Sequence, residues 1–579
     1  MKTILLITLL FSGLFAIDPD TEADYLIITH TNINGASQWL SDLEEIQTSR
    51  GFQVGSIIIS DGTSDQDINH IINSAYLTGV PVQYVMLVGS ASVQTPSSGD
   101  MSGKFGLDLG LRNIFTANAT DLNFIPFTID EDQSGWNEII DIPTDDLYYP
   151  NMDINTDIFI GRIPATSPQD MEQYVSKLST FYANVYNYKE RKSTEILLSQ
   201  NVDNPWVSVS GLGVDHMETS MIPHIPAQIN KEFIRSSEIH PNDPENAWYD
   251  DGTKSIPMEN AFINGINSGA GIVHYFGTGS ESVSLGNFFW QEDVMIGQGS
   301  GNPVGSDYNS LTNYDIHPVI LGNCCNIGEI QYPFSMLRKN LLQDLMFIPG
   351  GIISSISSTI YTNQWGCREF SIEQHDLIYN NDEQVHTLGE LSLMSKVRFE
   401  NRVVGQNWHS RGFVLYGDPS MPIPINQPQT QDITADKLWQ GSIVVENDLV
   451  IAAGVTLVVK QGTGIFFKEG TGLTVNGNLL FEGSDEFPVV LAAASESSVA
   501  KGYWDGLNIS ENSIVNWNFV EVRDANEIVF QSLSSSESAI NNSRFINNNS
   551  IKLNGGNVHF EDCYFEYNQY ALIVLAMNT

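Results

Sequence analysis

At 579 residues, the chain is too long for one hydrophobic core, and we expect about two to four domains. A formal net charge of −43, from 26 Lys+Arg against 69 Asp+Glu, argues against nucleic acid or an anionic membrane as a partner. A hydrophobic content of 41% excludes a disordered acidic tail, and four cysteines are too few for a disulfide scaffold.

The amino-terminal residues 1–16, MKTILLITLLFSGLFA, have the pattern of a secretory signal peptide: an early Lys, an apolar run and Ala16 at a cleavage position. This run is shorter than the roughly 20 residues that span a bilayer, and no other segment approaches that length. We therefore expect a secreted protein without an integral membrane span.

Strands and helices alternate over the next 400 or so residues, which predicts a parallel α/β sheet covered on both faces. Residues 23–150 form the first predicted subdomain, with buried strands at 25–30, 52–60 and 82–90. Residues 151–425 form the second subdomain, or the second half of one larger doubly wound sheet. Its predicted strands are 157–165, 194–201, 269–276, 317–324 and 350–358, and its predicted helices are near 168–187, 258–267 and 335–345.

Helical patterns end after a proline-rich stretch, and we interpret residues 426–440 as a linker. Residues 441–579 contain short alternating strands separated by Gly, Asn and Asp turns. SRFINNN (543–549) recurs as CYFEYNQ (563–569), which favours a right-handed parallel β-helix; a sandwich of two β domains is the alternative. Because the pattern continues to the end of the chain, we expect either a fragment or a last coil that another element covers.

Two loops follow predicted strands at the edge where open α/β sheets place their sites, FGTGSES (276–282) and NCCNIG (323–328). A thiol at a strand end is accessible to a substrate, so Cys324 and Cys325 are nucleophile candidates. Neighbouring strand residues point to opposite faces, so at most one of the two faces a site. The alternative is that both are buried as small hydrophobic residues.

Five segments, in this order and at these separations, resemble the gingipain-type cysteine peptidases of the caspase-like clan over about residues 23–425. They are DDLYYPNMDINTDIFIGRIPA (145–165), GAGIVHYFGTGSES (269–282), PVILGNCCNIG (318–328), STIYTNQWG (358–366) and LYGDPSMP (415–422). The resemblance implies a caspase-like fold in two α/β subdomains, a polypeptide substrate, and peptide-bond cleavage through an acyl-enzyme. It implies Cys325, in Cys-x-x-Gly, as the nucleophile, the backbone N–H groups of Gly279 and Cys325 as oxyanion donors, and Trp365 near the substrate pocket.

The position of the catalytic base departs from the family pattern Tyr-x-Gly-His-Gly-Ser, because Thr278 stands where the histidine is expected. An unassisted thiol with a pKa near 8.5 is only a few per cent thiolate at pH 7. The missing imidazole also removes a general acid worth about 10²–10⁴ in rate, so we expect severely impaired hydrolysis. His274 and His216 are candidate substitute bases. The alternative for His274 is a buried core histidine, and the alternative for His216 is a histidine in a solvated loop.

Two functions follow from these residues. The first is a secreted cysteine endopeptidase that uses Cys325. The second is a non-catalytic pseudopeptidase that binds through its groove, with the β-helix region as an adhesion surface or a surface for glycans.

No cofactor is required by any motif, since the chain has no zinc-ligand spacing, Walker loop or dinucleotide fingerprint. Structural Ca²⁺ is implied by the resemblance, although no stretch fits the EF-hand spacing. Its candidate carboxylates lie in turns at 100–103, 144–149 and 152–157.

Overall fold

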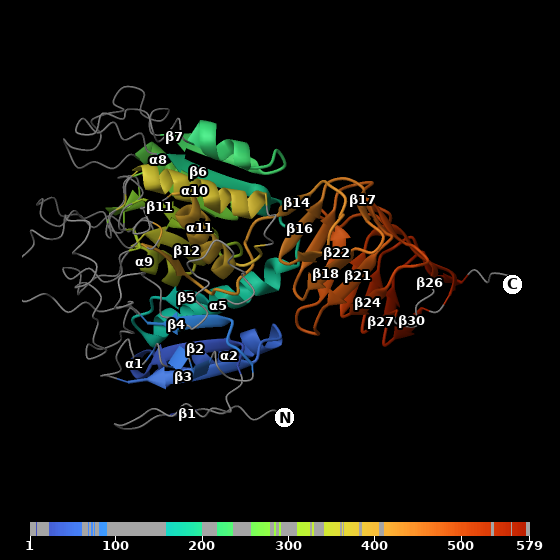
Figure 1. Cartoon of the computed structure of the whole chain (residues 1–579), viewed down its shortest axis with the longest axis horizontal. Helices are drawn as coiled ribbons and strands as arrows, with labels where there is room; N and C mark the ends of the chain where they lie inside the picture. Colours follow the sequence, from blue (N-terminus) through green and yellow to red (C-terminus); the bar gives the residue numbers. More distant parts are fainter. Residues whose placement is uncertain are drawn as a thin grey trace, which may run out of the picture.

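The computed structural model comprises an α/β region followed by an all-β region (Figure 1). It describes residues 7–8, 23–60, 68, 71–72, 74–75, 80–89, 158–199, 217–235, 256–277, 283–284, 289–290, 310–324, 327–328, 341–358, 362, 364–380, 385–403, 410, 412–533, 538–556 and 558–574. The signal peptide predicted at 1–16 and the subdomain boundary predicted at 150 lie outside these residues, apart from the two residues of β1.

One eleven-stranded sheet runs through the whole α/β region. Its strands, in spatial order, are β1 (Ile7–Thr8), β3 (Val54–Ile59), β2 (Tyr25–His30), β4 (Tyr84–Val88), β5 (Phe159–Ile163), β13 (Phe413–Tyr416), β12 (Ser354–Ser358), β11 (Val319–Asn323), β8 (Ile272–Phe276), β6 (Thr194–Ser199) and β7 (Asn230–Arg235). All pairings are parallel except that of β12 with β13. A separate antiparallel pair joins β9 (Val283–Ser284) and β10 (Phe289–Trp290). The predicted α/β architecture is confirmed, whereas the antiparallel β12–β13 pair departs from the predicted parallel sheet. β5 links the two halves because it pairs with both β4 and β13.

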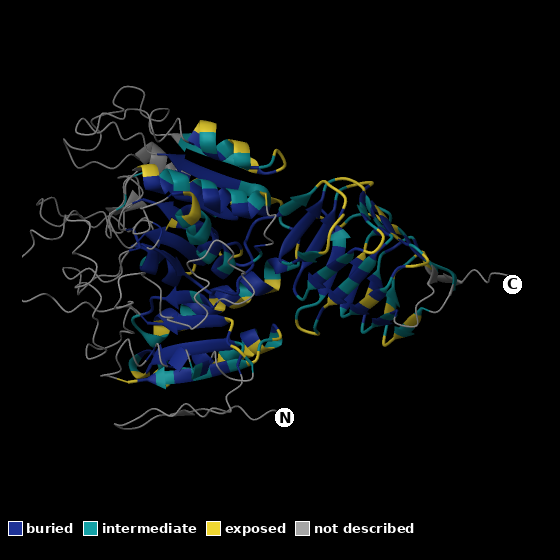
Figure 2. Cartoon of the chain, in the orientation of Figure 1, coloured by how far each residue is buried: buried dark blue, intermediate teal, exposed yellow. Residues whose placement is uncertain are grey.

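The helices pack on this sheet in two groups, one containing α2, α5 and α9 and the other α10 and α11. The helices are α1 (Thr31–Asn34), α2 (Trp39–Ser49), α5 (Pro168–Val185), α8 (Ile256–Asn267), α9 (Leu341–Phe347), α10 (Gln364–Tyr379) and α11 (Leu388–Arg402), with short turns η3 (Glu190–Ser193), η4 (Met217–Met221) and η5 (Ile222–His224). Local sequence fixes their starts: Ser167 caps α5 ahead of Pro168, and Thr387 and Glu390 form a capping box on α11. Figure 2 shows that the central strands of the sheet are buried and that exposed residues lie on outer helix faces and turns.

A buried carboxylate, Asp418, holds the two halves of the α/β region together. It accepts hydrogen bonds from Tyr25 Oη at 2.8 Å and from Tyr182 Oη and Gln47 Nε2 at 2.6 Å. The Arg50 guanidinium lies 3.4 Å away, so the charge has a buried counter-ion. This part of the LYGDPSMP motif therefore has a structural role.

The all-β region consists of three parallel sheets. The seven-stranded sheet contains β14 (Gln427–Gln429), β16 (Ser442–Val445), β19 (Gly464–Phe467), β22 (Val489–Ala493), β25 (Val520–Arg523), β28 (Arg544–Ile546) and β31 (Tyr564–Glu566). One six-stranded sheet contains β15 (Lys437–Trp439), β18 (Thr456–Lys460), β21 (Asn478–Glu482), β24 (Val515–Asn518), β27 (Ala539–Asn541) and β30 (His559–Glu561). The other contains β17 (Leu449–Ile451), β20 (Gly472–Val475), β23 (Trp504–Ile509), β26 (Ala525–Leu533), β29 (Ser550–Gly556) and β32 (Tyr570–Val574).

The predicted internal repeat has a direct structural counterpart. β28 and β31 pair in parallel with Arg544 opposite Tyr564, so equivalent residues of the two repeats stack. Equivalent corner residues also share a left-handed backbone, with φ of 65° at Asp524, 58° at Asn547 and 52° at Tyr567. The predicted all-β region with parallel strands is confirmed.

Some elements differ from the sequence-based expectation. The segment predicted as a linker, 426–440, contains β14 and β15, where Pro428 is tolerated because β14 is an edge strand. β7 and β13 are not predicted, because the first lacks an apolar run and the second has only four residues.

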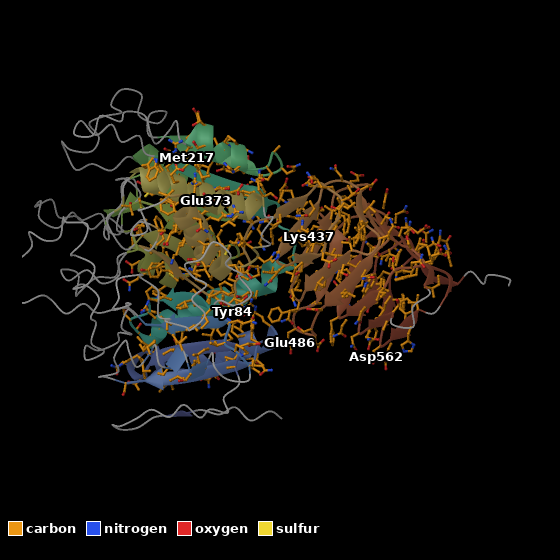
Figure 3. All side chains as sticks on the ribbon, in the orientation of Figure 1. Tyr84, Met217, Glu373, Lys437, Glu486 and Asp562 are labelled. Atoms are coloured by element: carbon orange, nitrogen blue, oxygen red, sulfur yellow. The ribbon has the colours of Figure 1, made fainter. Side chains whose placement is uncertain are left out.

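The all-β region packs against the large sheet near the start of β6. The backbone N–H of Asn426 donates to the carbonyl of Lys192, just before β6, and Tyr188 packs with Val444 and Phe466 in a small shared core. A cavity of about 410 Å³ lies at this junction, lined by Tyr84 and Phe487 among others. Figure 3 labels Tyr84 on the α/β side and Glu486, which precedes Phe487, on the all-β side. Among the described residues, no helix is long and apolar enough to cross a membrane.

Candidate active site

The two strands that precede the predicted catalytic loops, β8 and β11, are neighbours in the sheet. They pair in parallel with His274 opposite Leu321 and Phe276 opposite Asn323. Because parallel strands end at the same edge, the loops that follow Phe276 and Asn323 start side by side. This arrangement is the one expected for a nucleophile and a base on adjacent loops.

The loop after β11 is tied to the next strands at Gly328. Its N–H donates to the Ser358 carbonyl at 2.8 Å, and its carbonyl accepts from Tyr416 Oη at 2.5 Å. A Cβ at this position would lie 2.9 Å from the Tyr416 ring and 3.1 Å from the Ser357 and Ser358 carbonyl oxygens. The glycine of Cys-x-x-Gly is therefore required by close packing.

The predicted site residues are only partly described. Cys325, Thr278, Gly279 and His216 lie outside the described residues, so their assigned roles stay predictions, as do the calcium carboxylates at 100–103, 144–149 and 152–157. Cys324 follows β11 directly and is fully buried. Trp365 lies in the first turn of α10 and is 46% exposed, so it is not a core tryptophan.

His274 is a fully buried residue of β8. Its Nε2 lies 3.0 Å from Asn323 Nδ2, and its ring centroid lies 4.8 Å from that of His375. The imidazole is thus held inside the module beneath α10. This environment is that of a buried core histidine, which was the alternative to its role as a substitute base.

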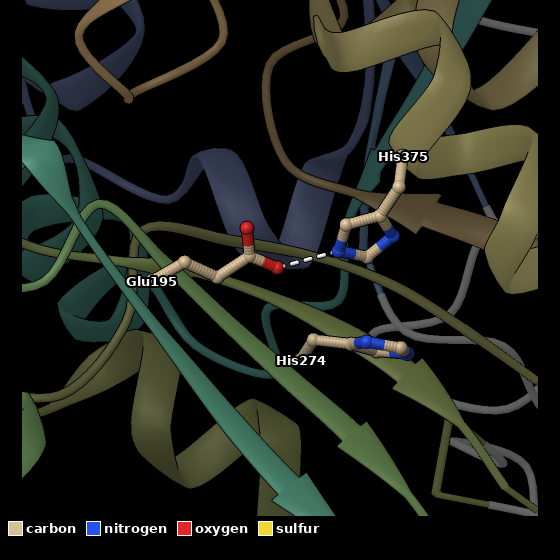
Figure 4. A group of neighbouring side chains, drawn as sticks. All are labelled: Glu195, His274 and His375. Carbon is tan, nitrogen blue, oxygen red and sulfur yellow. Dashed lines mark hydrogen bonds and ion pairs between the residues drawn. The ribbon is translucent and has the colours of Figure 1, made fainter. Parts of the chain in front are cut away.

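His375, from α10, forms a buried pair with Glu195, from β6 (Figure 4). Its Nδ1 lies 2.9 Å from the Ser371 carbonyl, which can only accept, so Nδ1 carries a proton. Its Nε2 lies 2.5 Å from Glu195 Oε1, and Tyr379 Oη donates to Glu195 Oε2 at 2.6 Å. Burial and the Glu195 carboxylate raise the pKa of Tyr379 well above its usual value, which keeps the phenol protonated as the donor.

Asn323, the last residue of β11, is held from two sides. Its Nδ2 contacts His274 Nε2 at 3.0 Å and donates to Gln374 Oε1 at 2.9 Å. Asn323 and Gln374 are both fully buried. We call the set Glu195, His274, Asn323, Gln374, His375 and Tyr379 the α10 polar cluster.

Within the described residues, Glu195, His274 and His375 are the group whose metal-ligating atoms lie close together, within 4.8 Å of one another. Two ligands about 2.1 Å from a tetrahedral zinc ion lie roughly 3.4 Å apart. His375 Nε2 and Glu195 Oε1 are only 2.5 Å apart, and the His274 ring nitrogens in Figure 4 are turned away from the carboxylate. The geometry fits a hydrogen bond between His375 and Glu195 rather than a metal ion.

The sequence does not reveal five members of the α10 polar cluster. Its one usable signal is a polar residue inside an otherwise apolar strand, as for Glu195 in TEILLS and Asn323 in VILGN. The helical members carry no such signal, because polar residues on a helix ordinarily face solvent.

Comparison with known proteins identifies the family. The sequence profile of peptidase family C25 matches residues 18–424. The chain belongs to this family. The predicted resemblance to gingipain-type cysteine peptidases is confirmed, and a polypeptide is the substrate class that the family implies. No curated protein sequence matches the chain.

Solved structures of gingipains are similar to this C25 chain at low identity. The Arg-specific cysteine proteinase gingipain R (RgpB) is 15% identical over 71% of this chain and 80% of its own, with a TM-score of 0.45. The complex of Porphyromonas gingivalis RgpB pro- and mature domains is 15% identical over 69% of this chain and 79% of its own, with a TM-score of 0.46. A separase–securin complex from Saccharomyces cerevisiae matches 46% of this chain and 14% of its own at 13% identity, with a TM-score of 0.28.

Proposed function

We propose that this C25 protein is a secreted cysteine peptidase whose nucleophile is Cys325 and whose hydrolytic rate is severely reduced by Thr278. The proposal rests on the parallel pairing of β8 with β11, whose last residues, Phe276 and Asn323, lie at one sheet edge and precede Thr278 and Cys325 by two residues each in the sequence. The Gly279 and Cys325 N–H groups serve as oxyanion donors, and this role needs no particular side chain. Trp365, exposed at the start of α10, borders the substrate groove in this proposal.

The lost imidazole affects two steps of the reaction. Without a base, the Cys325 thiol is only a few per cent ionised at pH 7, and without a general acid the departing amine is not protonated. A water molecule supplies the leaving proton instead, and a hydroxide or water then hydrolyses the acyl-enzyme. Formation of the thioester is therefore slow and acts as the limiting step.

A specific observation favours the second function, a pseudopeptidase that binds polypeptide without cleaving it. His274 is fully buried and its Nε2 is engaged by Asn323, so this histidine is poorly suited to replace the base. His216, the other candidate base, lies outside the described residues.

The experiment compares wild type with Thr278→His in the full chain, using a peptidyl electrophile that reacts with thiols and a mixed peptide library. Restoring the base is expected to raise cleavage by about 10²-fold or more. If only the variant cleaves, the active-peptidase proposal fails and the pseudopeptidase holds. If wild type cleaves and the variant is no faster, the pseudopeptidase fails. Cys325→Ala in the Thr278→His background is the control for contaminating peptidases.

The order of strands in the all-β region supports a parallel β-helix, since from β15 to β29 each strand pairs with the strand three positions later in the chain, as β22 does with β25. We assign one strand of each sheet to every coil. Residues 1–16 act as the secretion signal in this proposal. A glycan or cell-surface ligand of the β-helix, and structural Ca²⁺, stay predictions.

A further inference from the structure

The α10 polar cluster places five fully buried polar side chains in one part of the core: Glu195, His274, Asn323, Gln374 and His375. Burial of polar groups is unfavourable unless every group is paired. Asn323 Oδ1 and Gln374 Nε2 have no hydrogen-bond partner among the described residues. A buried network that is only partly satisfied is less stable than an apolar core of the same shape, so stability alone does not account for it.

The cluster extends from the end of β11 to the junction with the all-β region. At one end Asn323 is the last residue of β11, two residues before Cys325. At the other end Tyr379 lines a groove of about 780 Å³ at the junction with the all-β region. Glu195 and His375 connect the two ends, through Tyr379 on one side and through the ring contact with His274 on the other.

The contacts fix the end of the nucleophile strand. The Asn323 side chain is held by β8 through His274 and by α10 through Gln374. The His274 ring is in turn packed against His375, whose two nitrogens are both engaged. Each link is between buried groups, so water does not compete with it.

We propose that the α10 polar cluster is a positioning network: Gln374 and the Glu195–His375 pair hold Asn323, and through it the chain segment that carries the Cys325 thiol. This inference rests on the proposed function. A displacement of about 1 Å in a reacting group costs about 10²-fold in rate, so a nucleophile without its histidine depends strongly on position.

The test uses two buried glutamines of the same region, Gln374 and Gln343. Gln374→Met removes the anchor of Asn323, and the matched control Gln343→Met removes a hydrogen bond from α9 to the Pro164 carbonyl. Both substitutions keep side-chain length and packing. A difference between them is therefore specific to the strand end.

The first readout is native-state alkylation by iodoacetamide, resolved by peptide mass spectrometry. Cys324 is fully buried at the end of β11, and Cys563, half-buried in the all-β region, is the internal reference. Gln374→Met is expected to raise Cys324 labelling relative to Cys563 by about tenfold through local opening, and Gln343→Met by less than about twofold. Equal labelling of Cys324 in the two variants overturns the proposal.

The second readout is the reaction of Cys325 with the peptidyl electrophile. Gln374→Met is expected to lower the maximal inactivation rate about tenfold with the probe's binding constant unchanged, because position and not affinity is lost. An unchanged rate overturns the proposal. If the probe does not label wild type, the proposed peptidase function fails, while the Cys324 readout still decides the positioning network.

A variant that keeps shape covers the case in which Gln374→Met does not fold. Glu195→Gln retains the side-chain outline and removes the charge beside His375. It is expected to raise Cys324 labelling in the same direction, by about threefold. No change in a folded Glu195→Gln protein overturns the role of the Glu195–His375 pair.

Discussion

The α/β and all-β regions are stabilised in different ways. In the α/β region, decisive contacts join residues far apart in the chain: Asp418 and Tyr25 are 393 positions apart, and His375 and Glu195 are 180 apart. In the all-β region, side-chain hydrogen bonds repeat at short intervals, such as the 23 positions between Asn547 and Asp524. The first region thus depends on unique polar contacts, and the second on a repeated pattern.

The cores of the two regions also differ in how many polar groups they bury. The all-β core is a stack of aliphatic and aromatic side chains, with Phe467 and Trp504 rings 3.9 Å apart. The α/β core encloses ionisable groups, including Asp418 with Arg50, and Lys177, whose Nζ donates to the backbone carbonyls of Gly350 and Ile352. A repeated apolar stack depends on packing between neighbouring coils, whereas a buried charge depends on every partner.

The largest effect is expected for Asp418→Ala. This change leaves Arg50 buried without its counter-ion and removes the acceptor of Tyr25 and Tyr182, so it should cost about 3–5 kcal/mol. Hydrogen exchange of the β2 and α5 amides measures the loss.

The control for Asp418→Ala is Asp448→Ala in the all-β region. Asp448 Oδ1 accepts one exposed hydrogen bond from the Gly472 N–H. Its removal should cost about 1 kcal/mol or less. Equal losses for the two aspartates would contradict the difference between the regions.

The alternation of β21 gives a second prediction. Leu479 is fully buried and Leu480 is only half-buried, since adjacent residues point to opposite faces. Leu479→Ala should cost about 2–5 kcal/mol, and Leu480→Ala less than about 1 kcal/mol. Hydrogen exchange of β18 and β24, the neighbours of β21, measures both; a larger loss for Leu480→Ala would contradict the assigned faces.

Sequence patterns predict those parts of the fold that depend on local periodicity. The apolar run at 25–30 becomes β2, because a strand covered on both faces needs apolar residues at every position. The SRFINNN repeat becomes stacked strands because equivalent residues pair in register. β7, an edge strand with the sequence NKEFIR, lacks such a pattern and was missed.

The candidate site is predictable in one part only. The motif order predicts which two loops carry the site, and the strands that precede them, β8 and β11, do end at the same sheet edge. The roles of Cys325 and Thr278 stay predictions. The α10 polar cluster was not predicted, since Gln374 and His375 lie within a helix whose pattern gives no sign of which polar residues are buried. Their burial depends on tertiary packing against β8 and β11.

The third prediction concerns acid stability. His317 is 2% exposed, donates from Nε2 to the Pro349 carbonyl at 3.0 Å, and has no hydrogen-bond partner for Nδ1 among the described residues. Burial, followed by the nearby Lys177, lowers the pKa of His317 to about 4. Between about 4 and about 6.5 the unfolded chain binds a proton that the folded chain does not, so stability falls as pH falls through this range.

The loss attributable to His317 over this range is on the order of 3 kcal/mol. His317→Gln should flatten the dependence of unfolding free energy on pH between about 6.5 and about 4, as measured by urea titrations at several pH values. His559→Gln, at a 71% exposed position, is the control and should leave the slope unchanged. An unaltered slope in His317→Gln would contradict a neutral buried imidazole.

The smallest effects on stability are expected at surface ion pairs. These pairs also differ between the regions, as an isolated pair in one and a shared cation in the other. Lys460 and Glu482 form one exposed pair in the all-β region, with Nζ and Oε2 2.6 Å apart. Arg402 contacts both Glu369 and Glu373, joining α11 to α10 through two carboxylates. Lys460→Ala should cost about 0.2–1 kcal/mol in low salt. Arg402→Ala should cost more, because the two carboxylates of the network lose their shared cation at once.

Raising the ionic strength from about 0.1 M to about 1 M shortens the screening length from about 10 Å to about 3 Å. The loss of stability in Lys460→Ala should therefore vanish, while part of the loss in Arg402→Ala persists. Denaturant titrations at both salt concentrations measure this difference; an Arg402→Ala effect that vanishes equally would mean that the α10–α11 contact relies on no more than screened surface charge.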